Sequence, residues 1–173
     1  MNKVLILSDS HQLVEEIALI TARHDVPNMI HCGDSELAGD HQVLEGVHTV
    51  RGNCDHDERF PEEKVLLIDE ITFFVTHGHL HQVKSRTGLA NLSDYAKEKK
   101  VQVICYGHTH IAGAEKIDGQ LFINPGSIRM PRNRKEKTYA ILSWNSPTDV
   151  LVEFFTVSGV PVKELIYETS FLT

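Results

Sequence analysis

The chain has 173 residues, of which 41% are hydrophobic and 24% charged, a balance typical of a globular protein with room for one domain and its own core. No apolar stretch approaches the roughly 20 residues of a membrane-spanning helix, and the formal net charge of −7 argues against long nucleic acid as a partner. The cysteines, Cys32, Cys54 and Cys105, form no close pair, which favours a reducing cytoplasm. We therefore expect one domain over residues 1–173, a cytoplasmic location and no membrane partner.

The first part of the chain predicts alternating strands and helices. Val4–Ser8 is a continuous apolar run of strand length, as expected for a buried parallel strand. An amphipathic helix is expected over Gln12–His24, and the strand Asn28–Cys32 then completes a βαβ unit. A short helix within Glu36–Glu45 and a third strand at Val47–Val50 follow.

The middle of the chain predicts a hairpin, a helix and a buried strand. Lys64–Ile68 and Ile71–Thr76 flank Asp69-Glu70, which suits a tight turn between two strands. Ser85–Lys99 has apolar residues on one face and lysines in its last turn, as an amphipathic helix would. Val101–Tyr106 is a short apolar strand that stops at a glycine.

The last part of the chain is mostly antiparallel in its pattern. Gly113–Ile117 and Gln120–Asn124 flank Asp118-Gly119, a strong signal for a two-residue hairpin turn. Three further strands are expected at Tyr139–Trp144, Val150–Thr156 and Val160–Tyr167. The whole pattern predicts an α/β protein with two packed sheets and flanking helices.

Five of the predicted strands or turns end in polar residues that can bind a metal ion. Ligands of α/β sheets bind beyond the carboxyl ends of the strands, and glycine recurs where the backbone must approach a site closely. His108 and His110 are two residues apart, so in extended chain both imidazoles point to the same side. The five segments are Asp9-Ser10-His11, Gly33-Asp34, Gly52-Asn53, His77-Gly78-His79 and Gly107-His108-Thr109-His110.

The candidate ligands combine carboxylates, imidazoles and one amide, without the thiolate pair of a structural zinc site. They are Asp9, His11, Asp34, Asn53, His77, His108 and His110. Seven ligands are too many for one catalytic metal, and they suit two metals that share a carboxylate and clamp a phosphoryl group. Asp9 and Asp34 could instead cap helices, but both directly follow predicted strands, so we favour the metal role.

The ordered set DxH, GD, GN, H and GHxH resembles the calcineurin-like metallophosphoesterases. The form GNCD at residues 52–55 looks like their small bacterial and archaeal phosphodiesterase branch. The resemblance extends from Asp9 to the NPGS turn at residues 124–127. It implies a four-layer α/β/β/α sandwich of two mixed β-sheets flanked by helices. It also implies a metal-dependent phosphodiesterase with a two-metal, bridging-hydroxide mechanism.

The resemblance assigns the ligands by motif. One metal would take Asp9, His11, Asp34 and His110, and the second would take Asp34, Asn53, His77 and His108. Asp34 would bridge the two metals, and Asp34, Asn53, His77 and His108 would be catalytic. Families of this kind usually use manganese, and sometimes nickel, iron, zinc or magnesium, because mixed nitrogen and oxygen sites do not fix the metal by geometry alone.

Three residues are candidates for contact with the substrate: Cys54, Ser127 and Arg129. Many larger members of the family carry a histidine at the position of Cys54, placed to protonate the leaving oxygen, and a cysteine is a poorer match to that role. Ser127 belongs to the NPGS turn, which lies near the metals in the family. Arg129, with Arg132 and Arg134, forms either a basic rim for the rest of a diester or a solvated hairpin tip.

Several functions fit this site. A phosphomonoesterase or a nuclease is the runner-up, but the chain has no evident cap domain and no broad basic surface, which favours a small phosphodiester substrate. A non-catalytic interaction scaffold of the same fold, like the retromer subunit that resembles this family, is the alternative from another class. Such scaffolds lose ligands from the set, whereas this chain keeps all seven, so we favour the enzyme. Exposed strand edges in the second half are compatible with a homodimer.

Overall fold

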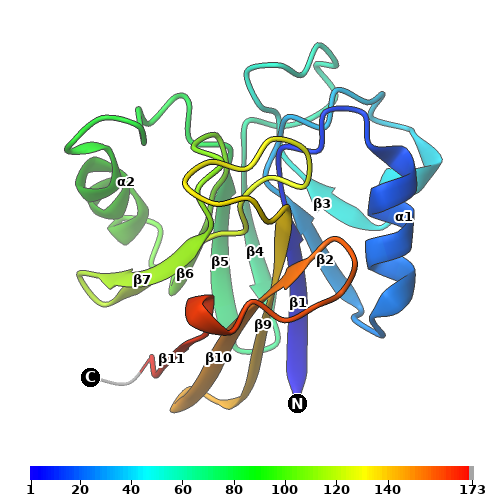
Figure 1. Cartoon of the computed structure of the whole chain (residues 1–173). Helices are drawn as coiled ribbons and strands as arrows, with labels where there is room; N and C mark the ends of the chain where they lie inside the picture. The colour runs from blue at the N-terminus through cyan, green and yellow to red at the C-terminus, as the bar shows by residue number, and fades with distance from the viewer. Residues whose placement is uncertain (172–173) are drawn as a thin grey trace.

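Two β-sheets stack face to face between two helices in this computed structural model (Figure 1). Within residues 1–171, which the structure describes, the strands are β1 (Asn2–Leu7), β2 (Asn28–His31), β3 (Val47–Thr49), β4 (Glu63–Ile68), β5 (Ile71–Thr76), β6 (Val103–Cys105), β7 (Gly113–Ile117), β8 (Gln120–Asn124), β9 (Thr138–Ser146), β10 (Asp149–Thr156) and β11 (Tyr167–Thr169). The helices are α1 (Val14–Arg23) and α2 (Gly88–Lys97), with short 3₁₀ helices η1 (Gln42–Leu44) and η2 (Lys163–Leu165).

Both sheets are mixed, and their parallel strands place five connections at one end of the molecule. The larger sheet has the order β11-β10-β9-β1-β2-β3, and β1, β2 and β3 are parallel. The smaller sheet has the order β4-β5-β6-β8-β7, and β5, β6 and β8 are parallel. The loops that follow β1, β2, β3, β5 and β6 therefore gather at the carboxyl ends of the strands, at the top of Figure 1.

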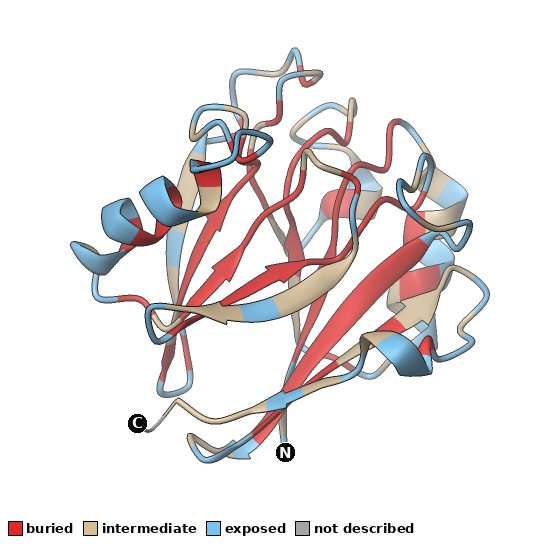
Figure 2. Cartoon of the chain, turned by 60° about the vertical axis from the view of Figure 1, so that its left-hand side comes forward, coloured by how far each residue is buried: buried red, intermediate tan, exposed pale blue. Residues whose placement is uncertain are grey.

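The alternation of side chains along β1 explains the layers. Val4 and Ile6 point into the core between the sheets, which also holds Phe73 and Trp144. Leu5 and Leu7 point to the other face, where they meet Ile17 and Ile20 of α1. A third apolar cluster lies beneath α2 on the outer face of the smaller sheet. The order of layers is thus α2, smaller sheet, larger sheet, α1, and Figure 2 shows the buried residues along the strands and the exposed ones on the outer faces of the helices.

Two predicted helices differ from the structure because the backbone turns left-handed where they should begin. The helix expected from Gln12 starts only at Val14, since Gln12 has a φ of 71°. The short helix expected within Glu36–Glu45 is the single 3₁₀ turn η1, and it begins only at Gln42, because Glu36 has a φ of 54°.

The prediction of a last strand over Val160–Tyr167 is wrong. Pro161 lacks a backbone N–H and forms only an isolated bridge to Phe155, after which the chain winds into η2. β10 pairs with β9 on one side, and its other side pairs with the short strand β11. The helix expected over Ser85–Lys99 covers Gly88–Lys97, because turns occupy the preceding residues.

None of the helices in residues 1–171 has the length and apolar character that crossing a membrane requires. The assignment of a single domain to residues 1–173 stays a prediction, although both sheets contribute to one apolar core.

Candidate metal centre

The loops after β1, β2, β3, β5 and β6 carry all seven predicted ligands. Five of these residues adopt a left-handed backbone conformation, which residues other than glycine rarely do. Their φ angles are 53° at Asp9, 42° at His11, 56° at Asp34, 66° at His108 and 60° at His110. Strain of this kind costs about 1–3 kcal/mol per residue and persists only where the surrounding structure enforces it, most often at functional sites. The backbone strain at these residues therefore lowers the stability of the fold, and it directs their side chains toward one site.

The carboxylate and imidazole atoms of these loops converge on two adjoining clusters. Asp9, His11 and His110 form one cluster, in which Asp9 Oδ1 lies 3.0 Å from Nε2 of His110. Asp9, Asp34 and His77 form the other, in which Asp34 Oδ2 lies 3.2 Å from Nε2 of His77. Within each cluster the ligand atoms lie within 4.8 Å of one another, and Asp9 belongs to both.

Asn53 and His108 border the second cluster. Asn53 Oδ1 lies 3.1 Å from Nε2 of His77, and the ring centroids of His108 and His77 are 5.1 Å apart. The backbone N–H of His108 donates to Asp9 Oδ2 over 3.2 Å, which ties the loop after β6 to the loop after β1. The structure thus gathers all seven residues in one place, and their role as metal ligands stays a prediction.

Three of the histidines are held in the same tautomer by hydrogen bonds on their outer side. Nδ1 of His77 donates to the carbonyl of Cys32 over 2.7 Å, and Nδ1 of His110 donates to the carbonyl of Met130 over 2.8 Å. Nδ1 of His11 lies 2.6 Å from the carboxylate of Glu36. In the neutral ring each Nε2 then carries a lone pair that faces the clusters, as in metal-binding histidines whose outer nitrogen is hydrogen-bonded.

The centres of the clusters hold acceptor atoms without donors. Asp9 Oδ1 and His11 Nε2 are buried, and neither has a hydrogen-bond partner in the described part of the chain. Nε2 of a neutral His77 likewise faces the oxygens of Asp34 and Asn53. Buried acceptors without donors are costly, and a cation between them would satisfy them all. The donor set, with carboxylate, amide and imidazole ligands, fits divalent metal ions.

Asp34 and His108 are held in the protonation states that bind metal, whereas the carboxylates of Asp34 and Asp9 raise the pKa of His77 against the effect of its burial. Burial opposes the ionisation of Asp34, but the adjacent His77, through the proton that its ring can take up, and the backbone N–H of Cys54 hold the pKa of Asp34 well below the ordinary value. Burial, together with the charges of His77 and Lys84, lowers the pKa of His108 to about 4. At neutral pH Asp34 is therefore a carboxylate and His108 a neutral imidazole, the forms that bind metal.

Asp55 is the residue on which the ligand loops depend and which the sequence reasoning missed. Its buried carboxylate accepts the backbone N–H groups of Asp34, Gly52 and Glu36 over 2.7–2.8 Å, and the hydroxyl of Ser35 over 3.2 Å. It therefore joins the loop after β2 to the loop after β3. In the sequence, Asp55 stands out only as the last residue of the GNCD segment, and that pattern does not indicate what its side chain binds.

Glu36 was missed as well. Its carboxylate holds Nδ1 of His11 and also accepts a hydrogen bond from the side chain of Gln12 over 3.2 Å. Glu36, His11 and Cys54 form a third group whose ligand atoms lie within 4.8 Å of one another. Because Nδ1 of His11 is already engaged, we assign Glu36 to orienting that imidazole.

The three predicted substrate contacts lie beside the clusters in different ways. Cys54 donates its backbone N–H to Asp34 Oδ1 over 2.7 Å, and burial with the charge of Asp34 raises the pKa of its thiol to about 11. The hydroxyl of Ser127 is buried and donates to the carbonyl of Asp9 over 2.8 Å. Arg129 is exposed and donates to the carbonyl of His11 over 2.8 Å. Their contact with substrate stays a prediction.

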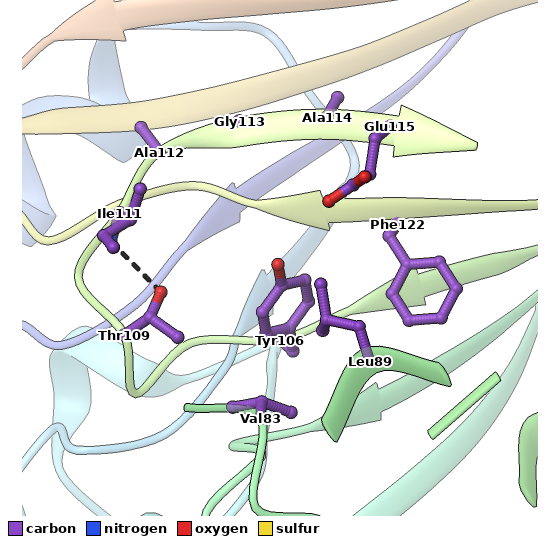
Figure 3. Close-up of a pocket in the computed structure, with 10 residues that line it drawn as sticks. All are labelled: Val83, Leu89, Tyr106, Thr109, Ile111, Ala112, Gly113, Ala114, Glu115 and Phe122. Carbon is purple, nitrogen blue, oxygen red and sulfur yellow. Dashed lines mark hydrogen bonds between the residues drawn. The ribbon is translucent and has the colours of Figure 1, made fainter. Parts of the chain in front are cut away.

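A groove of about 420 Å³ lies behind the loop that carries His108 and His110 (Figure 3). Its apolar wall includes Tyr106 and Phe122. Thr109 faces the groove, whereas His108 and His110, on either side of Thr109, face the clusters. The side chains of this loop thus alternate between the two sides, although His108 and His110 are left-handed and the loop is not an extended strand.

Comparisons with known proteins agree on the family. A family model described as a calcineurin-like phosphoesterase superfamily domain matches residues 2–146. The probable metallophosphoesterase YsnB of Bacillus subtilis is 46% identical over 164 residues, which are 94% of this chain and 95% of that protein. A crystal structure from Streptococcus pneumoniae TIGR4, described as a predicted phosphoesterase, is 31% identical with a TM-score of 0.92 and covers 98% of this chain and 97% of its own. Vacuolar Protein Sorting 29 of Cryptosporidium parvum, 18% identical over 98% of both chains, shares the fold with a TM-score of 0.76.

Gly52→Ala should disrupt the second cluster. A Cβ atom at residue 52 would collide with the carboxylate and the backbone nitrogen of Asp34, so the carboxylate must move. We expect metal affinity, measured by calorimetry, to fall on the order of 10–100-fold. Gly113→Ala is the matched control, because its Cβ would meet nothing within 4 Å. Equal affinity in both variants would show that close packing at residue 52 does not position Asp34.

His31 should make the metal-free protein less stable at mildly acidic pH. Its ring is fully buried, with Nδ1 accepting the N–H of Gly33 and Nε2 bonded to Ser10, and burial lowers its pKa from 6.5 to about 4. Between pH 6.5 and 4, His31 is protonated in the unfolded chain but not in the folded one. The free energy of unfolding therefore falls as pH decreases, by up to about 3 kcal/mol. Urea unfolding with a chelator should show a shallower fall in His31→Gln. An identical pH dependence in both proteins would contradict this account.

Proposed function

Because the chain belongs to the calcineurin-like phosphoesterase superfamily, we propose that it hydrolyses small phosphodiesters with two divalent metal ions bound at the loops described above. The observation that carries this proposal is the convergence of acceptor atoms in two adjoining clusters, with Asp9 Oδ1 and His11 Nε2 buried and without partners in residues 1–171. Two clusters favour two ions, and manganese is the metal that we propose, with nickel, iron, zinc or magnesium as alternatives.

When bound, such ions neutralise charge on the phosphoryl oxygens and lower the pKa of a water molecule toward neutrality. The chain contributes the geometry. Asp9 and Asp34 are the carboxylates among the predicted ligands, so their two negative charges do not cancel the charge of two divalent ions. An anionic phosphodiester is thereby attracted even though the formal net charge of the chain is −7.

A non-catalytic scaffold is the second candidate function, and the likeness to Vacuolar Protein Sorting 29 favours it at the level of the fold. The retention of all seven predicted ligands favours the enzyme.

A matched pair of substrates separates the enzyme from the scaffold: bis(p-nitrophenyl) phosphate, a diester, and p-nitrophenyl phosphate, a monoester. We expect the metal-free protein to be inactive and added Mn²⁺ to restore hydrolysis, with the diester having the higher kcat/KM. Turnover that favours the monoester would support the phosphomonoesterase, and no turnover with any of the five metals would support the scaffold.

The bridging role that the resemblance assigns to Asp34 predicts a distinctive variant. Asp34→Asn should weaken both metal sites, because it removes a shared charge, whereas His110→Ala should mainly weaken one. Asp9 belongs to both clusters, so Asp9→Asn is the matched comparison. Elemental analysis after dialysis measures the metal content of each variant. If Asp34→Asn lost the same single metal as His110→Ala, Asp34 would not be the bridge.

Cys54 is not expected to protonate the leaving group. A thiol with a pKa of about 11, raised by burial and by Asp34, donates its proton poorly at neutral pH. The rate should therefore fall steeply as the leaving-group pKa rises across a series of aryl and alkyl diesters, and Cys54→Ala should barely change it. Asn53→Ala, one residue earlier, should lose metal and most of the activity. A loss in Cys54→Ala confined to poor leaving groups, with both metals still bound, would identify the thiol as the acid.

A further inference from the structure

The loop between β8 and β9 brings two arginines to the edge of the first cluster. This loop passes over the carboxyl ends of the sheets and is yellow in Figure 1. The guanidinium of Arg129 donates to the carbonyl of His11, and the backbone N–H of Arg132 donates to the carbonyl of His110 over 2.9 Å. Arg129 is thus tied to His11 through its guanidinium, and Arg132 is tied to His110 through its backbone.

Both guanidinium groups keep most of their donors. Arginine has five N–H donors, and in residues 1–171 the side chain of Arg129 uses one of them, while that of Arg132 makes no hydrogen bond. We call Arg129 and Arg132 the arginine rim.

Arg134 lies in the same loop and behaves differently. Its Nη2 lies 2.6 Å from a carboxylate oxygen of Glu164, and its Nε lies 3.1 Å from Glu136. Its charge is therefore paired within the protein, and the three arginines that the sequence grouped together separate into two free cations and one paired one.

A hollow of about 350 Å³ lies beside Arg129 and reaches His11 of the first cluster. Its lining consists of His11, Gln12, Glu36, Arg129 and Met130. The Glu36 carboxylate accepts hydrogen bonds from Nδ1 of His11 and from the side chain of Gln12, so both of its oxygens are engaged. Gln12 and Glu36 both have a left-handed backbone, so strained residues beyond the ligand set also shape this hollow.

We propose that the arginine rim and this hollow form a subsite for a second phosphate group, carried on the ester substituent of the substrate away from the scissile phosphorus. Planar guanidinium groups bind phosphate through paired hydrogen bonds, which suits two arginines with unused donors. The subsite rests on the proposed function, since it defines the class of diester: one that bears an additional terminal phosphate. A substituent without that phosphate leaves the rim unpaired.

Two esters that differ only in the remote phosphate test this subsite. The first is thymidine 5′-(p-nitrophenyl phosphate), and the second is the same ester phosphorylated on its 3′ oxygen. Wild type should prefer the phosphorylated ester by about tenfold or more in kcat/KM, through a lower KM. Arg129→Ala and Arg132→Ala should each lower that ratio by several-fold to tenfold, and Arg134→Ala, the matched control, should keep it.

Three outcomes would overturn the subsite. They are no preference in the wild type, an equal loss for both esters in the rim variants, which would place the arginines on the scissile phosphoryl group, and an equal loss of preference in Arg134→Ala. Calorimetry keeps the subsite distinct from the proposed function. The Mn²⁺-loaded protein should bind thymidine 3′,5′-bisphosphate more tightly than thymidine 5′-phosphate, and the rim variants should lose the difference. If neither ester is hydrolysed, the diesterase proposal fails, and this binding comparison alone decides the subsite.

Discussion

Repulsion between acceptor atoms is the constraint on which this site depends. Two carboxylates and the inward lone pairs of at least three imidazoles lie within a few ångströms of each other, in a volume that holds few donors. In a low dielectric such an arrangement is unfavourable unless a cation enters it. The fold must therefore hold the ligands in place against their own repulsion, and much of the structure around the loops serves that purpose.

Three devices hold them. The first is the rigid pair of sheets, whose parallel strands end at the same level and leave five loops side by side. The second is the set of backbone hydrogen bonds that Asp55 accepts, which fixes the loops after β2 and β3 to each other. The third is close packing at Gly52 and Gly107, where a Cβ would collide with the carboxylates of Asp34 and Asp9. Each device acts on the backbone, so the ligands are positioned before a metal arrives.

The sequence predicted the layers and the gathering of the ligands because both follow from local patterns. Apolar runs such as Val4–Ser8 identify strands, and polar residues directly after them must meet where parallel strands end. The failures have equally local causes. Left-handed residues at Gln12 and Glu36 delay the start of the predicted helices, and Pro161 prevents the last predicted strand. No periodicity reports such conformations, because tertiary hydrogen bonds impose them.

The residues that orient the ligands were beyond sequence reasoning for a related reason. Glu36 acts on His11 from 25 positions away, and Asp55 accepts the backbone N–H of Asp34 across 21 positions. Such pairings depend on how loops pack and leave no regular spacing in the chain. In contrast, a ligand such as His110 is recognisable because its position at a strand end and its distance from His108 are both local properties.

Anomalous diffraction from crystals loaded with Mn²⁺ tests the central claim most directly. The account predicts two peaks, roughly 3.5–4 Å apart as in other two-metal sites. One should lie beside Asp9, His11 and His110, and the other beside Asn53, His77 and His108, with Asp34 in contact with both. A single peak, or peaks that Asp34 does not touch, would contradict it.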